Sequence, residues 1–86
     1  MPVPLSMVCQ AKRALEIIEA ALAEAGATMK HVVRTRIFVT DAGKFDDIAK
    51  AHGAVVSEIR PATTVVEVAK LVDAALMVEI EAVAVL

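Results

Sequence analysis

The chain has 86 residues, a net charge of −2 and one cysteine, and 58% of its residues are hydrophobic although only 2% are aromatic. These values exclude a disulfide-stabilised scaffold, and they argue against binding to a nucleic-acid backbone or stacking on its bases. We expect one small domain spanning residues 1–86, with more apolar surface than it can bury alone, and therefore association with copies of itself.

The chain begins with residues 1–5, which lack the basic and apolar regions of a secretory signal. Charged or strongly polar residues interrupt every long apolar stretch, so no membrane-spanning helix is predicted. Together with the lone Cys9, these features favour a cytoplasmic location and no membrane partner.

Residues 6–25 are predicted to form an amphipathic helix. Its apolar residues recur at steps of three and four, with charged residues between them: Val8, Ala11, Leu15, Ile18, Leu22 and Ala25. Gly26 is placed to end this helix, and residues 28–31 are expected to form a connecting turn.

Residues 32–40 are predicted to form a strand, because β-branched residues alternate with Arg34, Arg36 and Phe38. A second helix is expected over residues 44–57, although Gly53 lowers its helix propensity by about 1 kcal/mol. Residues 62–69 and 76–86 are predicted to be two further strands. The short connection 70–75 favours an antiparallel, hairpin-type pairing of these two.

The order strand, helix, strand over residues 32–69 predicts a βαβ crossover and an α/β (α+β) fold with both helices on one face of the sheet. The period of two predicts which residues lie under the helices: Val33, Ile37, Val66, Val68, Val78, Ile80 and Ala82. It places the following residues on the opposite face, toward solvent or a neighbouring subunit: Arg34, Arg36, Thr63, Val65, Glu67, Glu79 and Glu81.

Few residues carry obvious chemistry. The sequence has no Gly-rich phosphate loop, no Gly-x-Ser-x-Gly elbow and no metal-binding cluster, so we predict no metal and no cofactor. His31 and His52 are interpreted as structural or surface residues, and Cys9 as a buried, unreactive thiol.

Glu79 and Glu81 are the most notable pair. Two carboxylates at positions i and i+2 of a strand lie on one face about 7 Å apart, close enough to act as acid and base. The alternative, which residue types favour, is that they form salt bridges with Arg34 and Arg36. The two interpretations are compatible, because a glutamate held by an arginine can still position a water molecule.

Two segments near the C-terminus resemble the signature of a known family. The sequence R-P-A-T-T-V-V-E-V-A-K-L at residues 60–71, followed by V-E-I-E-A-V-A-V at residues 78–85, resembles the YjgF family, whose members are also called RidA, reactive-intermediate imine/enamine deaminases, or L-PSP proteins. Residues 14–26 and 32–41 agree with it, so the resemblance covers nearly all of residues 10–86. It implies a chorismate-mutase-like fold with a mixed sheet, assembled as a homotrimer with ligand clefts between subunits.

The resemblance also implies site residues. In active deaminases of this family, an arginine in a Pro-Ala-Arg-Ser segment binds the carboxylate of a 2-imino or 2-enamino acid. A glutamate in the last strand positions the water molecule that hydrolyses the imine. An ungapped alignment places that glutamate at Glu79, the catalytic candidate, and places the substrate-binding positions at Thr63, Thr64 and Val65.

Two departures from the family pattern affect the expected activity. Thr63 stands where the arginine belongs, and a hydroxyl offers one neutral hydrogen bond in place of a charged, bidentate fork. Arg60 is a poor substitute because it is expected on the other face, whereas Arg34 or Arg36 could reach the polar face. The family's N-terminal strands have no counterpart before Ser6.

The leading hypothesis is therefore a homo-oligomer that binds a small carboxylate metabolite in an intersubunit cleft, without deamination as its expected activity. The alternative is a structural or regulatory interaction module that kept the fold and lost the pocket. Endoribonuclease activity, suggested by the L-PSP name, ranks last because the chain lacks a basic surface for RNA.

Overall fold

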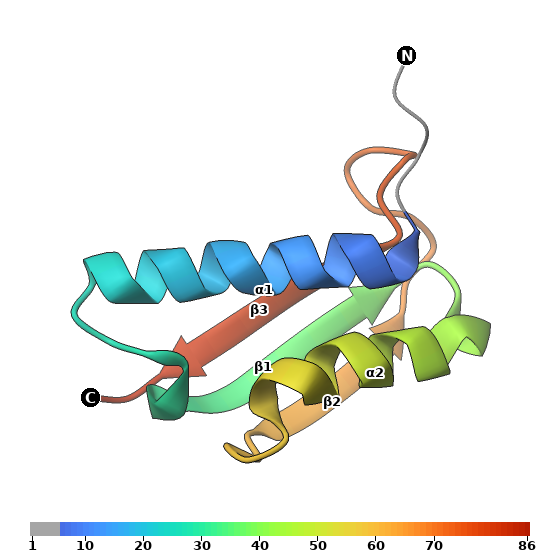
Figure 1. Cartoon of the computed structure of the whole chain (residues 1–86). Helices are drawn as coiled ribbons and strands as arrows, with labels where there is room; N and C mark the ends of the chain where they lie inside the picture. Colours follow the sequence, from blue (N-terminus) through green and yellow to red (C-terminus); the bar gives the residue numbers. More distant parts are fainter. Residues whose placement is uncertain (1–5) are drawn as a thin grey trace.

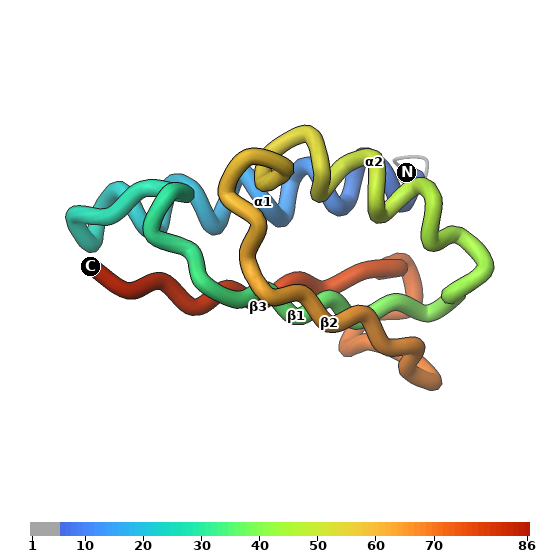
Figure 2. The backbone as a smooth tube through the Cα atoms, turned by 90° about the horizontal axis from the view of Figure 1, so that it is seen from below, coloured from blue at the N-terminus to red at the C-terminus, as the bar shows by residue number. Residues whose placement is uncertain are grey.

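The computed structural model describes residues 6–86, which form two layers. The predicted absence of a secretory signal concerns residues 1–5, which lie outside the described part. Two helices, α1 (Met7–Glu24) and α2 (Phe45–Val56), lie on the same side of three strands (Figures 1 and 2). Short 3-10 turns, η1 (Met29–His31) and η2 (Ala42–Lys44), lead into the first strand and into α2.

Helix α1 follows the predicted apolar stripe. Ser6 caps its start by accepting a hydrogen bond from the backbone N–H of Cys9 at 3.2 Å, and Gly26 follows its end with a φ of 83°, a left-handed conformation that suits glycine. Ala11 and Leu15 are buried as expected. The side chain of Cys9 is exposed, so the prediction of a buried thiol is wrong. Cys9 lies two positions from the buried Met7, which turns it away from the sheet.

The sheet has the order β2-β1-β3, with β1 (Val32–Val39) in the centre. Strand β1 is parallel to β2 (Ala62–Glu67) and antiparallel to β3 (Val78–Ala84). The predicted crossover is therefore confirmed, with its two parallel strands adjacent. Strands β2 and β3 run in opposite directions, as predicted, but their predicted hairpin pairing is wrong because β1 lies between them. Strand β1 has the most buried residues of the three strands. It is hydrogen-bonded to β2 on one side and to β3 on the other.

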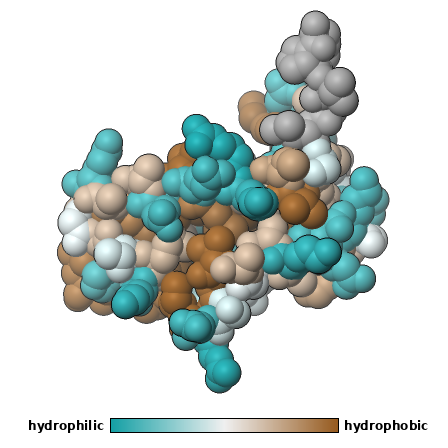
Figure 3. Space-filling model, viewed as in Figure 1, coloured by the Kyte–Doolittle hydropathy of each residue, from teal (hydrophilic) through white to brown (hydrophobic). Residues whose placement is uncertain are grey.

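The core fills the space between the helices and the sheet in two clusters. Ile37, Val39 and Ile48 belong to the first, whereas Leu15 and Val32 belong to the second. The space-filling view shows apolar residues along the gap between the two helices, flanked by hydrophilic residues (Figure 3). The sheet face opposite the helices is uncovered (Figure 2).

The faces of β1 agree with the prediction except at the start of the strand. Ile37 is 1% exposed and lies under the helices, but Val33 is 48% exposed. The pairing of β1 with β3 shifts between Val32 and Arg34, as at a β-bulge, and Val32 occupies the buried position in place of Val33.

The faces of β2 are the reverse of the prediction. Thr63 pairs with Thr35, Val65 with Ile37, and Glu67 with Val39, and these partners lie under the helices. Residues paired in register point to the same face, so Thr63, Val65 and Glu67 face α2, while Thr64 and Val66 face away. On β3 the prediction is confirmed: Val78, Ile80 and Ala82 face the helices, whereas Glu79 and Glu81 lie on the open face.

Candidate functional site

The four predicted site residues lie on two different faces of the sheet. Glu79 and Thr64 lie on the open face, and Thr63 and Val65 lie on the helix-covered face. The prediction that Thr63 and Glu79 lie on the same face of the sheet is therefore wrong. Thr63 is in register with Thr35 and Glu79 with Phe38, so the two residues are three positions apart along the sheet, on the strands either side of β1, as well as on opposite faces.

The open face presents Glu79 without a salt-bridge partner among residues 6–86. Arg36 Nε and Glu81 Oε1 are 3.1 Å apart, which confirms the predicted cross-strand pair for Glu81. Both side chains are about half exposed, 45% and 47%, so this pair contributes at most about 1 kcal/mol to stability. Glu79 pairs with Phe38, two positions along β3 from Glu81, and is exposed.

The other two residues line a cavity between α2 and β2, which we call the β2 cavity. Its volume is about 460 Å³, and it is lined by Ile37, Phe45, Ile48, Ala49, His52, Gly53, Thr63 and Val65. Most of its wall is apolar. Its polar groups are the Thr63 hydroxyl and the His52 imidazole, so it can bind a small molecule with one hydrogen-bonding end.

A chain of hydrogen bonds crosses the wall of the β2 cavity. His52 Nε2 is 3.0 Å from Thr35 Oγ1, which is 2.8 Å from Thr63 Oγ1, and the Thr63 hydroxyl donates to the Pro61 carbonyl at 3.2 Å. Each hydroxyl has one proton, so Thr35 donates to Thr63, and His52 donates its Nε2–H to Thr35. Thr35 is fully buried, and this arrangement uses both its donor and its acceptor capacity.

Sequence reasoning interpreted His52 as a structural or surface residue and did not predict that it lines a cavity. The structure places it in the wall of a cavity, beside a predicted substrate-binding residue. A signal was present, since His52 follows Phe45 and Ile48 by seven and four positions and therefore shares their face of the helix. The sequence alone could not show that this face covers Thr35 and Thr63.

Burial lowers the pKa of His52 below its ordinary value of 6.5, so the folded protein holds a neutral imidazole at pH 7. Between the folded pKa and pH 6.5, the unfolded chain binds more protons at this position than the folded chain. We therefore expect the His52 contribution to the free energy of unfolding to decrease as pH falls from 6.5 through the folded pKa.

This expectation can be checked by urea unfolding between pH 5 and pH 8. His52→Gln should flatten the decrease while keeping a hydrogen-bonding group next to Thr35. The control is His31→Gln: His31 is the other histidine, and its Nδ1 accepts from the Thr28 backbone N–H at 2.9 Å at the start of η1. An equally steep decrease in His52→Gln and the wild type would contradict the assignment.

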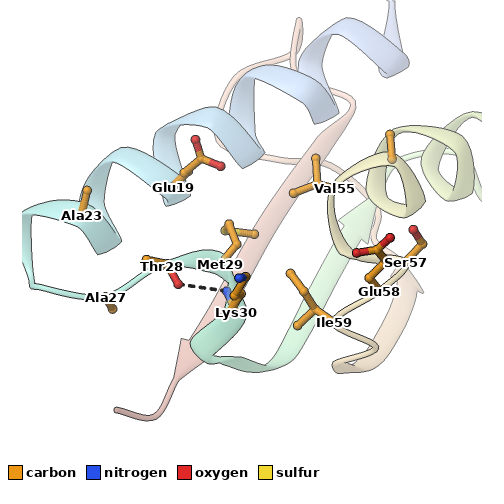
Figure 4. Close-up of a pocket in the computed structure, with 11 residues that line it drawn as sticks. Glu19, Ala23, Ala27, Thr28, Met29, Lys30, Val55, Ser57, Glu58 and Ile59 are labelled. Carbon is orange, nitrogen blue, oxygen red and sulfur yellow. Dashed lines mark hydrogen bonds between the residues drawn. The ribbon is translucent and has the colours of Figure 1, made fainter.

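Two further hollows lie away from the predicted site residues. A wide cleft of about 750 Å³ lies at the C-terminal ends of α1 and α2, with Glu19 and Glu58 on its two sides and Lys30 between them (Figure 4). Two carboxylates against one ammonium disfavour an anionic ligand there. A mostly apolar groove of about 310 Å³ runs between the helices, along Leu15 and Val55.

Within residues 6–86, no group of three or more His, Cys, Asp or Glu side chains could hold a metal ion. In the same part of the chain, neither helix combines the length and apolar character needed to cross a membrane.

The family described as "Endoribonuclease L-PSP" matches residues 2–86. The chain belongs to this family. It is 39% identical over 79 residues to protein DfrA of Myxococcus xanthus, covering 92% of this chain and 60% of that protein. It is 34% identical over 86 residues to the 2-iminobutanoate/2-iminopropanoate deaminase of Escherichia coli, covering 96% and 66%. The chain thus spans about 60% of the length of DfrA.

Solved structures of L-PSP family proteins have the same fold. A member of the YjgF/YER057c/UK114 family from Mycobacterium tuberculosis superposes with a TM-score of 0.89 at 45% identity, covering 90% of this chain and 65% of that one. The YjgF gene product of E. coli gives 0.88 at 33% identity, covering 98% and 68%. The predicted YjgF/RidA resemblance, and the α+β fold with its mixed sheet and two helices on one face, are thereby confirmed.

Proposed function

We propose that the chain works as a homo-oligomer that binds a small carboxylate metabolite in a cleft between subunits. In this cleft, the β2 cavity of one subunit meets the open sheet face of the next, which contributes Glu79. The observation that carries the proposal is the placement of Thr63 and Glu79 on opposite faces of one sheet. A small ligand can contact both residues only if they come from two subunits.

The exposed surfaces support association. The open face combines apolar side chains, Val66 at 40% exposure and Val83 at 49%, with the charged Arg34 and Glu79. Among residues 6–86, strand β2 is hydrogen-bonded to β1 alone, so its outer edge offers unpaired backbone groups. A trimer is the assembly that the family resemblance implies.

Relatives support the ligand class. The structure of TdcF from E. coli, 29% identical with a TM-score of 0.88, contains bound serine, a small molecule with a carboxylate. Another E. coli relative is named 2-iminobutanoate/2-iminopropanoate deaminase, and its name gives two small imino acids as substrates. A cavity with one polar end and apolar walls fits a short 2-keto or 2-imino acid.

Glu79 is assigned the catalytic position. In imine hydrolysis, a water molecule adds to the carbon of the C=N bond and ammonia leaves, which gives a 2-keto acid. A glutamate carboxylate next to the ligand would accept a proton from that water molecule. Because position 63 is threonine and not arginine, we propose that the chain binds the carboxylate metabolite without deaminating it efficiently. Thr63 and Val65 line the wall, and Thr64 lies on the open face.

The intersubunit arrangement can be tested by mixing two variants, Thr63→Val and Glu79→Gln. Each alone is expected to bind pyruvate several-fold more weakly, because each removes one hydrogen-bonding group from every cleft. Co-expressed subunits should recover full affinity in about a quarter of the clefts, those that pair an intact Thr63 with an intact Glu79. Isothermal titration calorimetry counts these sites.

No recovery in the mixture would place both residues in one subunit or outside the site, against the proposal. A monomeric mass by analytical ultracentrifugation at the binding concentration would also contradict it. If pyruvate and other 2-keto acids neither bind nor stabilise the protein, the alternative of a structural or regulatory interaction module is favoured.

A further inference from the structure

The geometry points to His52, in its imidazolium form, as the residue that binds the ligand's carboxylate in the β2 cavity. This inference rests on the proposed function. It gives the cavity a positive charge, on His52, that no other lining residue can supply. Of the eight residues that line the cavity, His52 is the only one that can carry a positive charge. It shares the cavity wall with Thr63, the position where active family members are expected to have arginine.

The hydrogen-bond chain makes protonation of His52 compatible with the folded wall. His52 donates its Nε2–H to Thr35, and an imidazolium does the same. A proton added at Nδ1 therefore breaks no hydrogen bond, and it creates a second donor. Thr35, itself hydrogen-bonded to Thr63, holds the ring at Nε2, so the orientation of this donor is set before a ligand arrives.

Among the residues that line the cavity, no carboxylate faces His52. Strand β1 presents Thr35 and Ile37 to it, strand β2 presents Thr63 and Val65, and the rest of the lining on α2 is uncharged. Glu67, the acidic residue on this side of β2, lies further along the strand and accepts a hydrogen bond from the Ala42 backbone N–H at 2.9 Å.

A ligand carboxylate would therefore be the counter-ion of His52. The apolar wall strengthens such an ion pair, since charges attract more strongly where water is excluded. The free cavity holds a neutral imidazole at pH 7, because burial lowers the pKa of His52. Binding of a carboxylate then takes up one proton from solution. The gain in affinity is fully present below the pKa of the free protein and is lost as pH rises through the higher pKa of the complex.

The test is calorimetric titration of the full chain with pyruvate between pH 5 and pH 8, in phosphate and in Tris buffer. Because the two buffers differ in ionisation enthalpy, the difference in measured heat gives the number of protons taken up. We expect uptake approaching one proton per site near pH 7, and affinity higher at pH 5 than at pH 8 on the order of a hundredfold. The pKa of His52, followed by NMR, should rise when pyruvate is added.

His52→Gln should bind pyruvate with little pH dependence and no proton uptake, whereas the control His31→Gln should keep both. Thermal unfolding will show whether His52→Gln folds, and His52→Asn replaces it if it does not. The NMR titration of the wild type tests the protonation of His52 without any substitution. Binding of pyruvate that is independent of pH, without proton uptake, would overturn the role of His52 and leave the proposed function intact. No binding of pyruvate at any pH would overturn the proposed function itself.

Discussion

Replacing Thr63 with arginine is expected to raise the affinity for pyruvate at pH 7.5 by at least about tenfold, because it adds a charged, bidentate donor worth about 1.5–3 kcal/mol to a cavity wall that lacks one. The pH dependence of binding should weaken as well, since His52 would no longer be the only lining residue that can carry a positive charge. Calorimetric titration with pyruvate at several pH values measures both effects.

The substitution has a structural cost. Thr35 would lose its hydrogen bond to the Thr63 hydroxyl but keep the one to His52, so we expect a loss of about 1 kcal/mol in the free energy of unfolding. That loss should be visible in urea unfolding without preventing folding.

Thr64→Arg is the matched control. Thr64 is the next residue of β2 and carries the same side chain, but it lies on the opposite face, in register with Arg36. Both variants add one positive charge at almost the same point of the chain, so a non-specific effect of charge would appear in both. An equal gain in affinity in the two variants, or a gain in Thr64→Arg alone, would show that the carboxylate does not bind in the β2 cavity.

Ile37→Ala is expected to lower the free energy of unfolding by about 2–5 kcal/mol, because it removes three carbon atoms from a core position and leaves a hole that the neighbours fill only in part. Ile37 is 1% exposed, lies on the central strand, and contacts the cluster that holds α1 and α2 on the sheet. In a domain of this size such a loss is a large share of the total stability. Urea unfolding at pH 7.5 measures it.

The matched control is Val33→Ala on the same strand. Val33 is 48% exposed at the shift in strand pairing, so its truncation should cost well under half as much as that of Ile37. The comparison also tests the corrected faces of β1, because sequence reasoning placed both residues under the helices. Similar losses in the two variants would mean that Val33 is buried in solution, for example against another subunit.

Most elements could be predicted because their local signals agree. The apolar stripe of α1, its glycine C-terminus, the β-branched alternation of β1 and the acidic first turn of α2 each reflect interactions between residues close in sequence. The faces of β3 were also predictable. Valine, glutamate, isoleucine, glutamate and alanine alternate strictly there, so only one phase buries the apolar side chains.

Strand β2 could not be assigned in the same way. Its sequence A-T-T-V-V-E contains a pair of threonines followed by a pair of valines, so either phase places one threonine and one valine on each face. Hydropathy favours the phase that keeps Glu67 out of the core, and the structure adopts the other one. The choice is made by the register with β1, where Thr63 meets the buried Thr35, and by α2, which covers that pair.

The sequence by itself determined the helices, the strands, the family and the position of Glu79, because each of these is carried by residues near one another in the chain. Only the tertiary structure decided the order of the strands, the faces of β2, and the meeting of His52, Thr35 and Thr63, which come from three separate elements. The physical reason is that a hydrogen bond between such elements depends on register and packing, which local periodicity does not encode. The separation of Thr63 from Glu79 across one sheet is of this kind, and the intersubunit cleft proposed for this chain follows from it.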